Sequence, residues 1–73
     1  MVQGKIPGQI TLTGNRRAVV EGCDGVVDYG EERMLFRMGR RTVTLTGKKL
    51  RLVRLTEDSA VVEGQLERVE LES

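Results

Sequence analysis

Residues 41–55 read RTVTLTGKKLRLVRL, and this stretch decides the expected fold class. Val43 and Leu45 alternate with threonines, which is the period-two pattern of a strand with one buried face. The alternation stops at residues 47–49 and resumes with Leu50. We therefore expect two short strands joined by a tight turn at the centre of the chain. The side chains expected at the heart of the core are Val43, Leu45, Leu50 and Leu52.

The rest of the chain repeats this pattern of short apolar alternations separated by turn residues. Further strands are expected over about residues 9–13, 17–21, 26–29, 33–38, 60–63 and 65–71. Gly14-Asn15 and Gly39-Arg40 suit two-residue hairpin loops, and Gly64 suits a bulge or bend. The pattern predicts an all-β fold: a small antiparallel sandwich, meander or barrel of about seven or eight short strands.

A carboxy-terminal helix over residues 57–71 is the alternative secondary structure, because this segment is rich in helix-forming residues. Val61-Val62 and Gly64 count against it, since a glycine inside a helix costs about 1 kcal/mol relative to alanine. We therefore favour strands here as well.

A chain of 73 residues forms one domain at most. We expect a flexible lead-in over residues 1–8, closed by Pro7-Gly8, and a single β domain over residues 9–73. A domain this small buries only roughly 60% of its unfolded surface, so its core is thin. Cys23 is the only cysteine and there is no histidine, so neither an internal disulfide nor a typical zinc site can supplement the core. Self-association is the remaining common way to stabilise such a small core, so we expect a homo-oligomer, specifically a dimer.

Two short segments of the chain occur twice. The sequence AVVEG occupies residues 18–22 and 60–64, and ITLTG at residues 10–14 resembles VTLTG at residues 43–47. The two separations differ, so this is not a fixed-period repeat. Two pseudo-equivalent halves and a chance likeness between strands both remain open.

No group of residues looks like an active site. Nucleophilic catalysis needs a base beside the nucleophile, and without histidine the usual partner is missing. Cys23 is expected to be a small buried or turn residue, and the acidic pairs at residues 31–32 and 57–58 fall in expected turns. Gly47-Lys48-Lys49 lacks the first glycine, the spacing and the following helix of a phosphate-binding loop. We expect no enzymatic activity, no cofactor, no metal and no small-molecule substrate.

Charge is distributed unevenly along the chain although its formal net charge is only +1. Residues 33–54 carry eight basic side chains and no acid, whereas residues 55–73 carry six acids and one arginine. The candidate interaction surface consists of Arg37, Arg40, Arg41, Lys48, Lys49, Arg51 and Arg54.

Several roles for these basic residues remain open. They can form a solvated face or pair with the acidic carboxy-terminal strands. They can also contact an anionic membrane or an acidic partner, or bind single-stranded nucleic acid as an OB-like or Sm-like barrel. Base stacking needs aromatic residues, and the chain has only Tyr29 and Phe36, the second of which alternates with methionines and is expected in the core.

The order of several short motifs resembles a known family. The motifs are Ile10-Thr-Leu-Thr-Gly-Asn, Val19-Val-Glu-Gly, Val27-Asp-Tyr, Met34-Leu-Phe, Val43-Thr-Leu-Thr-Gly-Lys-Lys-Leu-Arg-Leu and Val61-Val-Glu-Gly-Gln-Leu-Glu-Arg-Val. In this order they resemble the YabP/YqfC family of sporulation proteins over about residues 6–71, and look closest to the YqfC branch.

The resemblance implies a small all-β protein of endospore-forming Firmicutes, made in the mother cell and required at a later stage of spore development. It also implies a membrane-protein partner encoded next to it, and it supplies no catalytic residues. We therefore expect a non-enzymatic protein that acts through protein–protein contacts. Because the first residues lack the apolar core of a signal peptide, a cytoplasmic location is expected, with attachment at the forespore membrane only through a partner.

Overall fold

The computed structural model of the protein describes residues 8–72. It contains six strands: β1 (Gln9–Thr13), β2 (Arg17–Glu21), β3 (Gly25–Tyr29), β4 (Arg33–Met38), β5 (Arg41–Leu55) and β6 (Ser59–Glu72). No helix occurs among these residues, which confirms the all-β class and shows that the helical alternative for residues 57–71 is wrong. The lead-in expected over residues 1–8 lies, apart from Gly8, outside the described residues.

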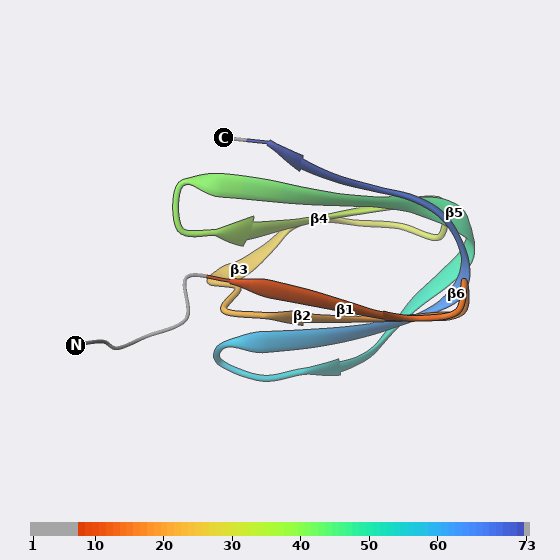
Figure 1. Cartoon of the computed structure of the whole chain (residues 1–73), viewed down its shortest axis with the longest axis horizontal. Helices are drawn as coiled ribbons and strands as arrows, with labels where there is room; N and C mark the ends of the chain where they lie inside the picture. The colour runs from red at the N-terminus through yellow and green to blue at the C-terminus, as the bar shows by residue number, and fades with distance from the viewer. Residues whose placement is uncertain (1–7, 73) are drawn as a thin grey trace.

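All six strands belong to one antiparallel sheet with the order β1-β2-β6-β5-β4-β3. Figure 1 shows that β5 and β6 bend strongly, so that the two halves of the sheet face each other. The first layer consists of β1, β2, residues 59–63 of β6 and the end of β5. The second layer consists of β3, β4, the start of β5 and residues 66–72 of β6. The two longest strands are therefore shared by both layers.

The core lies between the layers and takes alternate apolar side chains mainly from β2, β4, β5 and β6, whereas Ile10 of β1 and Val26 of β3 are partly buried against it. Its largest fully buried side chains are Phe36, Met34, Leu45, Leu50, Val20, Val43 and Val62. Burial of Val43, Leu45 and Leu50 confirms their expected place, whereas Leu52 is only partly buried and packs against the core from one side. Apolar burial at about 25 cal/mol per Å² is the main stabilising term for such a core.

Residues 41–55 form one continuous bent strand, so the predicted central hairpin is wrong. Strand pairing with β6 shifts register between Thr46 and Gly47 and again between Lys48 and Arg51. Lys49 takes a positive φ of 55°, which the sequence did not indicate. The two irregularities bend the strand rather than reverse it, as β-bulges do. This merger, together with a single β6, reduces the strand count from the expected seven or eight to six.

Backbone hydrogen bonds from the β3–β4 loop hold the bend of β5. The amide of Gly47 donates to the carbonyl of Glu32 at 3.0 Å, and the amide of Leu50 donates to the carbonyl of Glu31 at 2.8 Å. A Cβ atom on Gly47 would collide with the carbonyl oxygen of Gln65. Only glycine allows β5 and β6 to approach this closely here.

The bend of β6 is built in the same way at Gly64, as expected. Gly64 has a φ of 145° and donates its amide to the carbonyl of Arg16 at 3.0 Å. Leu66 donates to the carbonyl of Asn15 at 2.7 Å. The β1–β2 loop thus holds one bend and the β3–β4 loop holds the other.

The two glycine-containing hairpin loops differ in length. Met38 pairs directly with Arg41 across the β4–β5 loop, where Gly39 has a φ of 64°, so the two-residue loop is confirmed. Thr13 pairs with Arg17 instead, so the β1–β2 loop contains three residues and its two-residue prediction is wrong. The extra residue lets two consecutive loop carbonyls reach the bend of β6.

The duplicated AVVEG segments lie beside each other in the first layer. Ala18 pairs with Val62, and Val20 pairs with Ala60, so each alanine faces a valine of the other copy. The other two similar segments lie in β1 and β5, which are not neighbours in the sheet. The duplication therefore corresponds to a local antiparallel pairing and not to two equivalent halves.

Candidate functional site

The seven basic residues proposed as an interaction surface do not form one continuous strip. Arg37 lies in β4, Arg40 and Arg41 lie at the β4–β5 turn, Lys48 and Lys49 lie at the bend of β5, and Arg51 and Arg54 lie near its end. All seven are exposed. The bend of β5 places Arg40 and Arg41 of the turn in a different layer from Arg51 and Arg54. The alternation of apolar residues in the sequence does not encode this bend, so it could not predict the separation.

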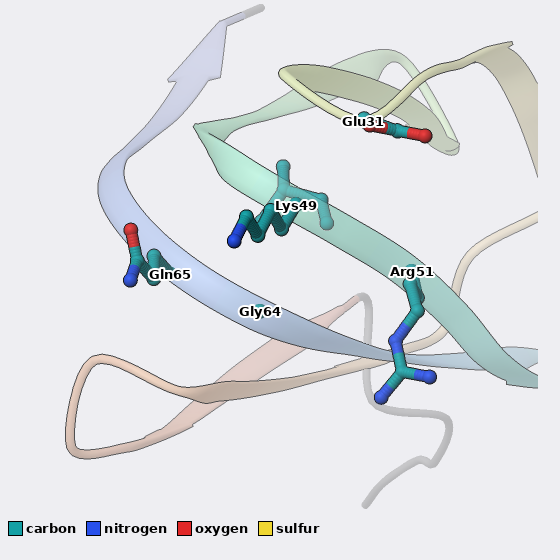
Figure 2. Close-up of a pocket in the computed structure, with 6 residues that line it drawn as sticks. Glu31, Lys49, Arg51, Gly64 and Gln65 are labelled. Atoms are coloured by element: carbon teal, nitrogen blue, oxygen red, sulfur yellow. The ribbon is translucent and has the colours of Figure 1, made fainter.

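Two of the seven meet at a shallow hollow beside the two bends. Its lining consists of Glu31, Lys49, Leu50, Arg51, Gly64 and Gln65. Figure 2 shows Lys49 and Arg51 extending from β5, with Gln65 on the neighbouring stretch of β6 and Glu31 on the loop opposite. The side chains can offer two cationic groups and an amide to an anionic group. Glu31 reduces the net positive charge of the hollow.

A second hollow lies at the other end of the molecule, between the start of β1 and the β4–β5 turn. Ile10, Met38 and Leu71 contribute apolar surface to it, and Arg40 and Arg41 lie beside them. The two predicted arginines of the turn are thus grouped with apolar side chains and apart from the cations at the bend.

The outer face of the first layer carries a row of alternating charges. Arg17, Glu63 and Arg51 are neighbours across three adjacent strands, and the guanidinium of Arg17 lies 3.8 Å from the carboxylate of Glu63. Both side chains of this ion pair are substantially exposed, so it contributes only about 0–1 kcal/mol. Among residues 8–72, Arg51 is the one predicted basic residue that lies directly opposite an acid of the carboxy-terminal segment.

The large exposed apolar side chains concentrate on the outermost strands of the two layers. They are Leu12 in β1, Val27 and Tyr29 in β3, Val53 and Leu55 near the end of β5, and Leu71 near the end of β6, with exposed fractions from 45% to 64%. Sequence analysis missed this feature because alternation distinguishes the two faces of a strand but not a central strand from an edge. These strand edges therefore expose apolar surface to solvent.

Cys23 lies in the connection between β2 and β3 and is only 2% exposed, as expected for a small buried residue. Its amide donates to the carbonyl of Asp58 at 3.2 Å. Burial raises the pKa of the Cys23 thiol, and the negative charges of Asp24 and Asp58 raise it further. Because the thiolate is the nucleophilic form, this thiol is poorly reactive at neutral pH.

The two aromatic residues take opposite positions. Phe36 is fully buried, whereas Tyr29 is 64% exposed on β3. In the described part of the chain, no three acidic or cysteine side chains are arranged to hold a metal ion. Residues 8–72 also contain no helix long and apolar enough to cross a membrane.

These features define a small β protein in which the strand edges and the two bends are the prominent surfaces. The chain belongs to the YabP family, whose model matches residues 4–73, nearly its whole length. The match confirms the resemblance seen in the motifs and indicates a sporulation-related protein, and this is not a known enzyme family. The match does not distinguish the YqfC branch, which stays a prediction. No curated protein and no solved structure matches the chain.

Proposed function

We propose that this protein is a non-enzymatic sporulation protein that acts through protein–protein contacts in the mother cell. Its expected partners are a membrane protein and further copies of itself. The observation that carries the proposal is the family match over residues 4–73. The exposed apolar residues on the strand edges support the mode of action.

Edge strands give a physical basis for such contacts. An edge strand presents unpaired backbone N–H and C=O groups in a row, and an added strand can satisfy them. Leu55 and Leu71 lie on such edges and are about half exposed, so an added strand would also cover apolar surface. A partner that supplies an extended segment fits this chemistry better than a compact ligand does.

The experiment is a pull-down of the tagged protein from sporulating cells, followed by identification of the captured proteins. We expect a membrane protein to be recovered, and a fluorescent fusion to concentrate at the forespore membrane during the same period. The test variant replaces Leu71 on the edge of β6 with aspartate and should capture less of the partner. The matched control replaces exposed Glu21 with alanine, because this residue lies in β2, between two paired strands. A fusion that stays diffuse throughout sporulation, combined with normal spores from a deletion strain, would refute the proposal.

Binding of single-stranded nucleic acid is the second candidate, and one observation favours it. Lys49 and Arg51 share a hollow that can accept a phosphate group. Tyr29 is the exposed aromatic residue available for stacking, and it lies on β3, outside the lining of this hollow. An anisotropy titration with single-stranded DNA and RNA at low salt tests this candidate. Saturable binding that weakens steeply with salt would support it.

A further inference from the structure

We infer that copies of this chain associate edge to edge, with the acidic edge of one copy adding to the basic edge of the next. The basic edge is residues 51–55 of β5, and the acidic edge is residues 66–72 of β6. This inference deepens the proposed function, because it names a second copy of the chain as a partner of these edges.

Both edges have one hydrogen-bonding side without a strand partner among the described residues. The basic edge pairs only with β6, because the ladder between β4 and β5 covers residues 41–46. Apart from the hydrogen bond from Leu66 to the β1–β2 loop, the acidic edge pairs only with β5, because the ladder between β2 and β6 covers residues 59–63. Each edge can therefore accept one more strand.

The charged side chains on the two edges have opposite sign. The basic edge carries exposed Arg51 and Arg54. The acidic edge carries exposed Glu67, Glu70 and Glu72, against the single base Arg68. Within residues 8–72 the two ion pairs are Arg17–Glu63 and Arg33–Asp28, so none of these edge charges is paired within the chain.

The apolar faces of the two edges match as well. Leu55 lies opposite buried Ala60, so it points to the inner face of the first layer. Leu71 lies opposite buried Val43, so it points to the inner face of the second layer. Both leucines are about half exposed, at 52% and 48%. Edge pairing with the inner faces aligned would place leucine against leucine and arginine near glutamate.

Contacts between like edges are disfavoured by the same charges. Two basic edges would bring arginines together, and two acidic edges would bring glutamates together, and like charges on adjacent strands destabilise a sheet. The edge of β1 carries no charge, and β3 has an irregular register between Val26 and Asp28. Among these edge pairings, the basic edge with the acidic edge is the one in which opposite charges attract on the outer face and leucines pack together on the inner face.

This pairing does not close into a dimer by itself. A contact between two different patches leaves one free patch at each end, so association continues unless a ring closes. Figure 1 draws the end of β6 at the top of the molecule and the end of β5 near the bottom. The assembly is therefore expected to grow beyond two copies as concentration rises.

The test reverses the charge of each edge separately, in the full chain. One variant combines Arg51→Glu with Arg54→Glu, and the other combines Glu70→Lys with Glu72→Lys. Sedimentation velocity and light scattering at low salt should show a mass that grows with concentration for the unmodified protein. Each variant alone should need at least about tenfold higher concentration to associate, because several cross-strand charge pairs become repulsive. An equimolar mixture of the two variants should associate again, since the reversed edges are complementary.

Two control variants carry the same changes in net charge away from the edges. Arg16→Glu with Arg37→Glu matches the first variant, and Glu21→Lys with Glu32→Lys matches the second; all four residues are exposed and lie outside both edges. Both should associate as the unmodified protein does. Circular dichroism establishes that every variant is folded, and Arg51→Gln with Arg54→Gln replaces the first variant if that one unfolds.

Any one of the following outcomes would overturn the inference. They are an unmodified protein that remains monomeric at millimolar concentration, a closed dimer, loss of association in the controls equal to that in the edge variants, and a mixture that stays monomeric. Stronger association of a single edge variant would show that the charges keep the edges apart, and would also overturn it. Because these measurements use purified protein, a negative result leaves the pull-down from sporulating cells as an independent test of the proposed function.

Discussion

Glycine at position 64 lets β5 and β6 pass close to each other where both strands bend. Its φ of 145° is a conformation that side-chain-bearing residues rarely adopt. A Cβ atom there would lie 2.6 Å from the carbonyl oxygen of Lys49 and 2.8 Å from the Cα of Leu50. These are backbone atoms, so the collision cannot be relieved by rotating a side chain.

Gly64→Ala should lower the free energy of unfolding by about 2–4 kcal/mol, because it adds both backbone strain and overpacking. Urea denaturation followed by circular dichroism measures the change. Gly25→Ala is the matched control, since no atom lies within 4 Å of its Cβ position and its φ is not positive. This control should change stability by less than about 1 kcal/mol. Equal effects of the two substitutions would contradict the account of the bend.

The Cys23 thiol should make stability depend on pH in the alkaline range. Its pKa in the folded protein is raised above the ordinary value of 9.0 by burial and by neighbouring acids. The folded state therefore keeps the proton to higher pH than the unfolded chain does, and the free energy of unfolding falls as pH rises above 9.0.

Urea midpoints of the unmodified protein and of Cys23→Ala at pH 7.5 and pH 10 test this dependence. The unmodified protein should lose more stability between the two pH values than the variant does, because the variant lacks the titrating thiol. Other groups titrate in both proteins and cancel in the comparison. Parallel changes would show that Cys23 ionises equally in the folded and unfolded states.

The loops between β3 and β4 and between β1 and β2 hold the bends of β5 and β6 in place. The carbonyls of Glu31 and Asn15 accept hydrogen bonds from the amides of Leu50 and Leu66, at 2.8 Å and 2.7 Å. These bonds lie outside the β5–β6 ladder, and they satisfy amides that the register shifts would otherwise leave unpaired.

Hydrogen exchange should therefore detect the bends as protected sites. We expect the amides of Leu50 and Leu66 to exchange only through global unfolding, on the same timescale as the amide of buried Leu45. Glu57 is the reference for fast exchange, because it lies in the exposed β5–β6 turn. Fast exchange at Leu50 or Leu66 would show that the loops do not hold the bends. Nuclear magnetic resonance in deuterated solvent provides the measurement.

Strand positions were predictable from the sequence, but the path of the longest strands was not. Alternation located the segments around Val43 and Leu50 correctly, and the same glycine was recognised at position 47. Whether a strand reverses or bends at a glycine depends on hydrogen bonds to residues that are distant in the sequence. Here those hydrogen bonds go to the carbonyls of residues 31 and 32, and no local pattern around Gly47 encodes them.

The two layers should unfold as one unit, because β5 and β6 belong to both. Leu45→Ala in the second layer should lower the free energy of unfolding by about 2–5 kcal/mol, since it leaves a cavity in the core. Val62→Ala in the first layer should have a smaller effect of the same kind. Exchange rates of slowly exchanging amides should rise by one common factor in both layers for each variant. A variant that accelerates exchange in its own layer alone would contradict this cooperative behaviour.

The candidate surfaces depend on the whole molecule, which explains why the sequence located them only in part. Leu45 and Leu55 have similar sequence surroundings, yet one is fully buried and the other is 52% exposed. The difference arises because β4 covers one side of β5 before the bend and no described strand covers that side after it. Likewise, the seven basic residues all fall within residues 37–54 but are separated in space by the same bend.

Sharing of β5 and β6 between the layers also has a mechanical consequence. A partner that pulls on the end of β6 in the second layer transmits tension along the same backbone to residues 59–63, which pair with β2 in the first layer. The strand cannot slide without breaking several ladder hydrogen bonds together, and the loop carbonyls at Gly64 resist straightening. A force applied at one strand edge is therefore transmitted through β5 and β6 to both layers of the sheet.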